Sequence, residues 1–230
     1  DDNDGDEYKY GLGAFVMAQA SIFAGGKDEV EVYPWIQAEW GHFFVNGPSL
    51  GILVRERDNW GVLASLELDF TGDTDRGDSQ QLSDMNELNE AVLASIQMFY
   101  VTDRGEIDFT IGSDIGVGHK GYMASFNYGY PMEFRGWEIE PSIEIGWSSK
   151  EINRYFYGVS EMEVRANRPF YQPNAGMNYE LGLSAMYSFD QRHSILVEVE
   201  NTIYSSEIRN SPIVSNSNAF VASSAYIYHF

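Results

Sequence analysis

Apolar and polar residues alternate most clearly in the last eleven residues of the chain, 220–230. One parity of this segment is apolar and largely aromatic: Phe220, Ala222, Tyr226, Tyr228 and Phe230. The other parity carries small or polar residues, among them Ser223 and His229. Since alternate side chains of a strand point to opposite faces, the segment predicts the closing strand of an outer-membrane β-barrel, with aromatics at the water–lipid interface. Taken alone, it also fits the last edge strand of a soluble sandwich.

The same alternation recurs along the whole chain, and several apolar stripes both begin and end with an aromatic residue. Examples are Trp60 with Phe70, Trp137 with Trp147, and Tyr179 with Tyr187. A lipid-facing band with two interfacial girdles explains this placement, whereas a soluble sandwich has no reason for it. The predicted membrane-interface aromatics are Trp60, Phe70, Trp137, Trp147, Tyr226, Tyr228 and Phe230.

Connections between the predicted strands alternate between short and long. The long ones are 71–90, 149–176 and 206–217, and the connections between them are mostly a few residues. Outer-membrane barrels have short periplasmic turns and long external loops. We therefore predict an all-β fold, a transmembrane antiparallel up-and-down barrel of the outer-membrane type with both termini in the periplasm. Twelve strands are favoured, and the count is ten if 42–46 is a bulge or a loop.

Composition adds limits to this picture. The chain has 230 residues without cysteine or a change in composition, which predicts one barrel domain over 8–230 and excludes disulfides and thiolate metal sites. The chain has no run of about 18 apolar residues, so no membrane helix is predicted. A barrel strand needs an apolar residue only at every second position. The acidic segment 1–7 looks like a mature amino-terminus, and we expect it in the periplasm.

Acidic residues dominate both the net charge and the predicted lumen. A formal charge of −21 argues against nucleic acid as a partner. It favours cations, and we expect outer-membrane lipid and lipopolysaccharide around the barrel. The inward parity carries Glu31, Glu67, Asp69, Asp108, Asp114, Glu140, Glu144, Glu180, Glu198 and Glu200. Arg55 is one of the few basic residues that we expect on the same parity. So many carboxylates need water or ions beside them, which suggests a passage for small cations. The alternative is a narrow barrel that conducts no ions, in which the carboxylates are solvated and only fill the interior.

Other candidate chemistry is weak. Asp73 and Asp75 at alternate positions, followed by Gly77 and Asp78, resemble the start of a calcium loop, but position twelve is Asp84 and not glutamate. A solvated acidic loop is the preferred interpretation, so no metal and no cofactor is predicted. A catalytic cluster at the outer rim would need a histidine beside a carboxylate or a serine. The four histidines are scattered, and His119 is the one that maps to that rim. We do not expect an enzyme.

Loop 149–176 holds Tyr155-Phe-Tyr-Gly-Val-Ser160 and then Arg168-Pro-Phe-Tyr171, and Ser211-Pro-Ile-Val214 follows. With His42-Phe-Phe-Val-Asn-Gly-Pro-Ser-Leu-Gly51 upstream, this order resembles the MipA/OmpV family of outer-membrane proteins (MltA-interacting protein and its relatives). The chain departs from the family pattern at Glu161-Met162, where an acidic–Ala pair usually follows.

The resemblance implies a non-catalytic envelope scaffold that joins peptidoglycan-lytic and peptidoglycan-synthesis enzymes. Alternatives are a narrow cation-preferring, porin-like channel and, more weakly, a surface adhesin. The predicted mouth-loop residues are Tyr155, Tyr157, Arg165, Arg168 and Tyr171. We expect this loop to narrow the outer mouth, with Arg165 or Arg168 beside a lumen carboxylate such as Glu67, Asp114 or Glu144. Simple packing among loops is the alternative.

Overall fold

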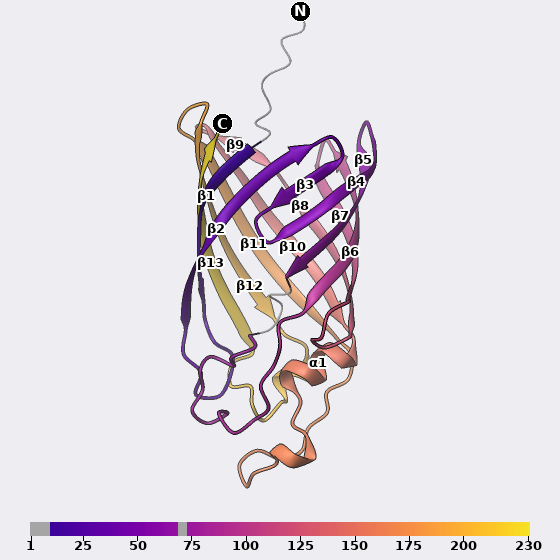
Figure 1. Cartoon of the computed structure of the whole chain (residues 1–230), viewed down its shortest axis with the longest axis vertical. Coiled ribbons are helices and arrows are strands. Elements are labelled where there is room, and N and C mark those ends of the chain that lie inside the picture. Colours follow the sequence, from indigo (N-terminus) through magenta and orange to yellow (C-terminus); the bar gives the residue numbers. More distant parts are fainter. Residues whose placement is uncertain (1–9, 69–72) are drawn as a thin grey trace, which may run out of the picture.

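The computed structural model describes residues 10–68 and 73–230. Its strands curl into a closed antiparallel barrel (Figure 1). The strands are β1 (Tyr10–Gln19), β2 (Glu29–Trp40), β3 (Phe43–Asn46), β4 (Ser49–Arg57), β5 (Trp60–Leu68), β6 (Val92–Thr102), β7 (Gly105–Asp114), β8 (Tyr122–Gly129), β9 (Met132–Phe134), β10 (Trp137–Ser148), β11 (Gly176–Ser188), β12 (His193–Ile203) and β13 (Asn218–His229). Two short α-helices, α1 (Lys150–Tyr157) and α2 (Ser206–Arg209), and a 3₁₀ turn (Glu161–Glu163) lie in the connections.

Twelve strands form the wall. Each pairs with the next in sequence, β1 pairs with β13, and β10 pairs with both β8 and β11. The short β9 continues β8, because Gly129 pairs with Ser142 and Met132 with Ile139 in one unbroken register. The twelve-strand prediction is therefore confirmed, and segment 42–46 contributes the short strand β3.

Side chains alternate across the wall as the sequence pattern predicts. On β2, Val30 and Val32 are 70% and 66% exposed on the outer face, whereas Glu31 and Trp35 point inward and are half-buried. Such apolar exposure is unfavourable in water but is the usual outer surface of a membrane barrel. Pro34 also lies on the outer face, opposite Ala14 of β1.

A β-bulge in β4 reverses the alternation near the strand end. Leu53 pairs with Leu63, but Arg55 pairs with Val62, so Val54 is the extra residue. An extra residue shifts every later side chain to the other face. We expected Arg55 inside the lumen, and this was wrong. Its guanidinium lies 5.9 Å from the ring centre of Trp60, on the outer face.

The two ends of the barrel differ. At the end called here the turn end, β1 begins and β13 finishes, and the Phe230 N–H donates to the Tyr10 carbonyl at 3.1 Å. Short turns connect the other strands there, as Figure 1 shows. The opposite end, the loop end, carries the long connections and α1. Asp69 and Phe70, predicted as a lumen acid and an interface aromatic, lie outside the described residues.

Four connections at the loop end pack into what we call the cap: residues 20–28, 73–91, 149–175 and 204–217. The buried apolar cluster of the described residues lies mainly there, and not in the barrel. Its members are Ile22, Phe23, Leu82, Met85, Ile152, Phe156, Tyr157, Val159, Ile208, Ile213 and Ala219. Of these, Phe156, Val159 and Ile213 are at most 1% exposed. Within the described ranges, no helix is long and apolar enough to cross a membrane.

Candidate acidic lumen and its cap

One side of the inner wall carries a ladder of carboxylates, called here the acidic wall: Asp108, Glu140, Glu144, Glu180, Glu198 and Glu200. Strand register places these side chains in rows. In the row nearest the cap, Asp108 faces Asn127, Asn127 faces Glu144, and Glu144 faces Glu180. Neighbouring strands lie about 4.8 Å apart, so this row puts acids on adjacent strands.

The next rows step towards the turn end. Glu200 lies opposite Gly182, one row below Glu180. Glu198 lies opposite Ser184, which in turn faces Glu140, one row further down. The acidic wall therefore runs lengthwise from the cap towards the turn end.

Neutral donors hold several of these carboxylates. Gln97 Nε2 donates to Asp108 at 2.8 Å, and Asn127 Nδ2 donates to its second oxygen at 3.4 Å. Thr202 Oγ1 donates to Glu180 at 2.7 Å, and Ser223 Oγ to Glu198 at 3.1 Å. Hydroxyl and amide donors orient a carboxylate without cancelling its charge, so the wall keeps a negative potential.

Lysine and arginine are missing from the inner face of the strands that the structure describes. The sequences of these strands contain only two arginines and no lysine, namely Arg55 and Arg57. Both lie beyond the bulge and pair with outward positions, Val62 and Trp60. The negative charge of the acidic wall is thus not balanced by lysine or arginine within the described barrel wall.

The opposite side of the lumen is aromatic. Phe15 and Trp35 point inward and pack with ring centres 5.5 Å apart. Phe44 and Phe99 extend over Gly51 and Gly61, where an added Cβ would lie 2.5 Å and 2.3 Å from the respective ring. The lumen therefore has an acidic side, formed by β7 and β10–β12, and an aromatic side, formed by β1–β6.

Three other predicted lumen acids have different surroundings. Glu31 accepts a hydrogen bond from Tyr33 on β2, and Glu67 lies inward near the end of β5. Asp114 is not part of the acidic wall. Its oxygens accept the backbone N–H groups of Gly116 and Lys120, at 2.7 Å and 2.8 Å. It is a buried carboxylate that caps the turn after β7, because the strand ends there.

Helix α1 closes the lumen at the loop end. Ile152, Asn153, Phe156 and Tyr157 line a cavity of about 240 Å³ together with residues of the barrel wall. The barrel side of this cavity includes Glu144, Glu180, Glu200, Asn178 and Thr202. Tyr204 lines it as well, and burial raises the pKa of its phenol to about 12, so that group stays neutral. Residues 152, 153, 156 and 157 of loop 149–176 therefore lie over this end of the lumen.

The two arginines of this loop do not reach the lumen, which corrects our prediction. Arg165 and Arg168 both pair with Asp84 of the cap, at 2.6 Å and 2.8 Å. The hydrogen bond from Arg168 lowers the pKa of the Asp84 carboxyl. Arg168 is buried and also donates to the carbonyls of Glu163 and Gln81. The arginines lie beyond α1, and α1 is what faces the lumen, so they bind neighbouring cap residues.

The mouth-loop tyrosines also join the cap segments to one another. Tyr155 Oη donates to the carbonyl of Asn89 at 2.9 Å, and Tyr171 Oη to that of Glu207 at 2.8 Å. Tyr157 is 3% exposed and stacks on Phe23 with ring centres 5.9 Å apart. The alternative of packing among loops therefore describes Tyr155, Tyr171 and the two arginines. Tyr157 packs in the cap and also lines the cavity beneath α1.

The candidate calcium loop is explained by turn geometry. Asp73 accepts the backbone N–H groups of Asp75 and Gly77, at 2.8 Å and 2.5 Å, so its oxygens serve their own turn. Across residues 10–68 and 73–230, no group of three or more acidic, histidine or cysteine side chains could hold a metal ion.

The predicted interface aromatics that the structure describes lie on outward positions near the strand ends. Trp147 is near the loop end, and the others are near the turn end: Trp60, Trp137, Tyr226, Tyr228 and Phe230. Phe230 is 64% exposed and Tyr226 47%. Amphipathic rings at both ends of an apolar band suit the two membrane–water interfaces.

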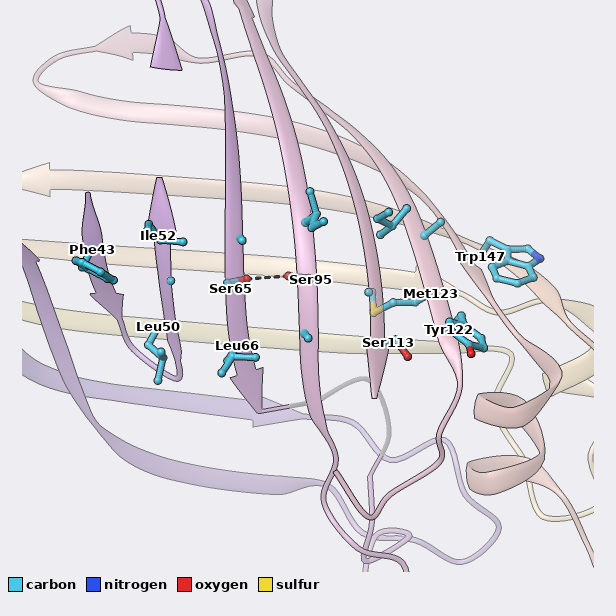
Figure 2. A pocket seen from close by; sticks show the side chains of 17 residues that line it. Phe43, Leu50, Ile52, Ser65, Leu66, Ser95, Ser113, Tyr122, Met123 and Trp147 are labelled. Carbon is cyan, nitrogen blue, oxygen red and sulfur yellow. Dashed lines mark hydrogen bonds between the residues drawn. The ribbon is translucent and has the colours of Figure 1, made fainter. Parts of the chain in front are cut away.

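An apolar groove of about 800 Å³ runs across β3–β8 and β10 on this outer face (Figure 2). Phe43 and Trp147 lie at its two extremes, and Leu50, Leu66 and Tyr122 line it between them. Ala64 and Ala94 lie on the same outer parity as Leu66, so small residues deepen the surface there. The groove belongs to the surface that lipid covers, and the candidate functional site is inside the barrel.

A closed antiparallel barrel with an apolar, aromatic-bounded outer face defines an outer-membrane β-barrel protein. The chain belongs to the family described as MltA-interacting protein MipA, whose model matches residues 11–230. It is 26% identical to the MltA-interacting protein of Escherichia coli K12, over 97% of this chain and 91% of that one. It is 25% identical to outer membrane protein OmpV of Vibrio cholerae, over 80% of this chain and 73% of the relative, and 25% identical to Omp26La of Vibrio anguillarum, over 81% and 74%.

Among solved structures, the chain resembles the COG4313 outer membrane channel of Pseudomonas putida F1, with a TM-score of 0.47 and 11% identity over the whole of both chains. The CymD monoaromatic hydrocarbon channel gives the same TM-score and identity, over 97% of this chain and 89% of that one. These values describe a general resemblance between barrels.

Proposed function

We propose that this barrel is a narrow, cation-preferring passage across the outer membrane, with the loop end outside the cell and the turn end in the periplasm. The observation that carries the proposal is the acidic wall, which faces the lumen with no lysine or arginine on the inner face of the described strands. Carboxylate-lined lumens favour cations and repel anions. The cap narrows the outer mouth, so we expect a small conductance.

Reversal potentials in planar bilayers test this proposal. With a KCl gradient across the wild-type barrel, the sign should show preference for K⁺ over Cl⁻. The preference should weaken at high salt, because screening shortens the reach of the wall charges, and also as the pH falls into the range where carboxylates protonate. The triple variant Glu144→Gln, Glu180→Gln, Glu200→Gln should lose most of it. Anion preference at neutral pH, or no conductance at all, contradicts the proposal.

A second candidate is a scaffold that binds a peptidoglycan-lytic enzyme. It is favoured by one observation, the name of the Escherichia coli relative, MltA-interacting protein. The turn end offers only short connections between strands in the described residues, so segment 1–7 is the larger candidate contact. We expect immobilised barrel to bind the lytic transglycosylase of the same cell, and to bind it less well after removal of 1–7. Equal binding without that segment would show that the enzyme contacts the turns between the strands instead.

A further inference from the structure

We propose that the cavity beneath α1 is a binding site for a linear alkyl polyamine, with its chain directed along the acidic wall towards the turn end. The inference rests on the proposed function, because it names the class of cation that the passage accepts. Four features of the cavity lead to it.

The first feature is the placement of the charges. Glu144 and Glu180 are direct cross-strand neighbours, and Glu200 lies one row nearer the turn end. Two residues along a strand correspond to about 6.6 Å. Gly182, opposite Glu200, has no side chain of its own, and the small Ser142 side chain lies over it. Successive charges along a wall fit a ligand with successive ammonium groups.

The second feature is an acceptor without a donor. Asn153 of α1 is 0% exposed, and its Nδ2 donates to the carbonyl of Asn174 at 2.7 Å. Its Oδ1 is buried and has no hydrogen-bond donor among the described residues, although Asn153 lines the same cavity as the three glutamates. A buried acceptor without a donor is costly, and an ammonium N–H of a bound amine would satisfy it.

The third feature is the lining between the charges. Met17, Val221, Ile208 and the rings of Tyr157 and Tyr204 contribute to the cavity beside the carboxylates. Methylene groups gain free energy by leaving water against such surfaces. Aromatic faces also attract ammonium groups. A mixed lining of acids and apolar groups suits an alkylamine better than a fully hydrated ion.

The fourth feature concerns metal ions. Within the described ranges, no three acidic or histidine side chains converge closely enough to hold one metal. Divalent cations need several oxygen ligands at about 2.0–2.6 Å. The spread of Glu144, Glu180 and Glu200 over three strands therefore favours separate ammonium groups on one chain.

Isothermal titration of the full-length barrel in nanodiscs of neutral lipid with spermidine tests the proposal at low ionic strength. Wild-type protein should bind spermidine. Glu180→Gln and Glu200→Gln should each weaken the affinity at least tenfold. These substitutions are nearly isosteric and relieve repulsion, so we expect the barrel to stay folded, and far-UV circular dichroism checks this. The matched control is Glu138→Gln, an exposed glutamate near the turn end of β10, which should change the affinity less than twofold.

Three results would overturn the site: no spermidine binding to the wild type, equal losses in the control and the two test variants, or displacement of spermidine by equimolar Mg²⁺. Single-channel recording separates this proposal from the passage itself. A barrel that binds spermidine through Glu180 and Glu200 but carries no current disproves the passage and leaves the site. A cation-selective current that spermidine neither blocks nor slows disproves the site and leaves the passage.

Discussion

Arg165 and Arg168 contact the same carboxylate from different environments. The Arg168 side chain is 5% exposed, while that of Arg165 is 48% exposed. An exposed ion pair contributes little because water already solvates both charges. A buried guanidinium that also satisfies a buried carbonyl, here that of Glu163, contributes more.

We therefore expect Arg168→Met to loosen the cap and Arg165→Met to leave it nearly unchanged. The first substitution leaves the Glu163 carbonyl without its donor, at a cost of about 1–3 kcal/mol for a buried acceptor. Limited proteolysis of the folded barrel in nanodiscs, followed by mass spectrometry, measures cleavage within residues 149–175. Equal cleavage rates in the two variants would show that burial of Arg168 does not matter.

Glu163 gives the cap a dependence on pH. Burial raises the pKa of its carboxyl, but hydrogen bonds from Ser160 and from the Asn86 N–H outweigh it, and the pKa lies below the usual 4.5. A carboxyl with a lowered pKa in the folded state stabilises that state above the unfolded pKa and loses this effect as the pH falls through the folded value. The cap should thus lose stability, and open more often, as the pH falls below the usual glutamate range of about 4.3.

Proteolysis with an acid-active protease across pH 2–6 measures this opening. Glu163→Gln, which cannot titrate, should flatten the acid limb of the profile. An unchanged limb in that variant would assign the opening to other carboxylates of the cap.

At the scale of elements, the close approach of β1 and β13 closes the barrel. A Cβ at Gly13 would lie 1.9 Å from the Tyr226 carbonyl oxygen, a backbone atom of the neighbouring strand. At Gly146, by contrast, the nearest atom is the end of the Glu144 side chain, at 3.5 Å. Both glycines are on the inner face, so they form a matched pair.

We expect Gly13→Ala to destabilise the barrel by about 1–3 kcal/mol or more, because the β1–β13 contact must widen. Gly146→Ala should have little effect. Urea unfolding midpoints in lipid vesicles compare the two. A Gly13→Ala barrel as stable as the wild type would show that this seam can relax.

The strands could be predicted from the sequence because alternation is local and strong. Stripes bounded by aromatics, such as Trp137 to Trp147, fix both the face and the ends of a strand. The bulge at Val54 could not be predicted in this way, since one extra residue changes the parity without changing the composition. The inward assignment of Arg55 was wrong for that reason.

The structure of the cap could not be predicted from the sequence, for a different reason. Its contacts join residues far apart in the chain, such as Arg168 with Asp84, and they follow no period. From the sequence we could predict only that a long loop narrows the mouth. The alternation of the strands predicted that Glu144, Glu180 and Glu200 face the lumen. It gave no sign of Asn153, because a single asparagine in a long loop has no pattern that marks it as buried.

At the scale of the whole molecule, the acidic wall and the cap should have separable effects on transport. In the proposed passage, the acidic wall selects the ions and the cap limits the current. Ser148 and Gly176 are direct partners at the loop end of β10 and β11, so a short turn can join these strands. Residues 150–174 can thus be replaced by a Gly-Ser link without changing strand register.

We expect this shortened barrel to conduct several-fold more than the wild type while its reversal potential keeps the same sign, since the acidic wall remains. The preference for K⁺ should be weaker, because a wider, wetter mouth screens the carboxylates better. Spermidine affinity should fall as well, because Asn153 and Tyr157 leave with α1. Arg165→Met, which keeps the cap closed, is the control and should conduct like the wild type. A shortened barrel with unchanged conductance would place the narrowest point deeper in the lumen, on the aromatic side near Phe15 and Trp35.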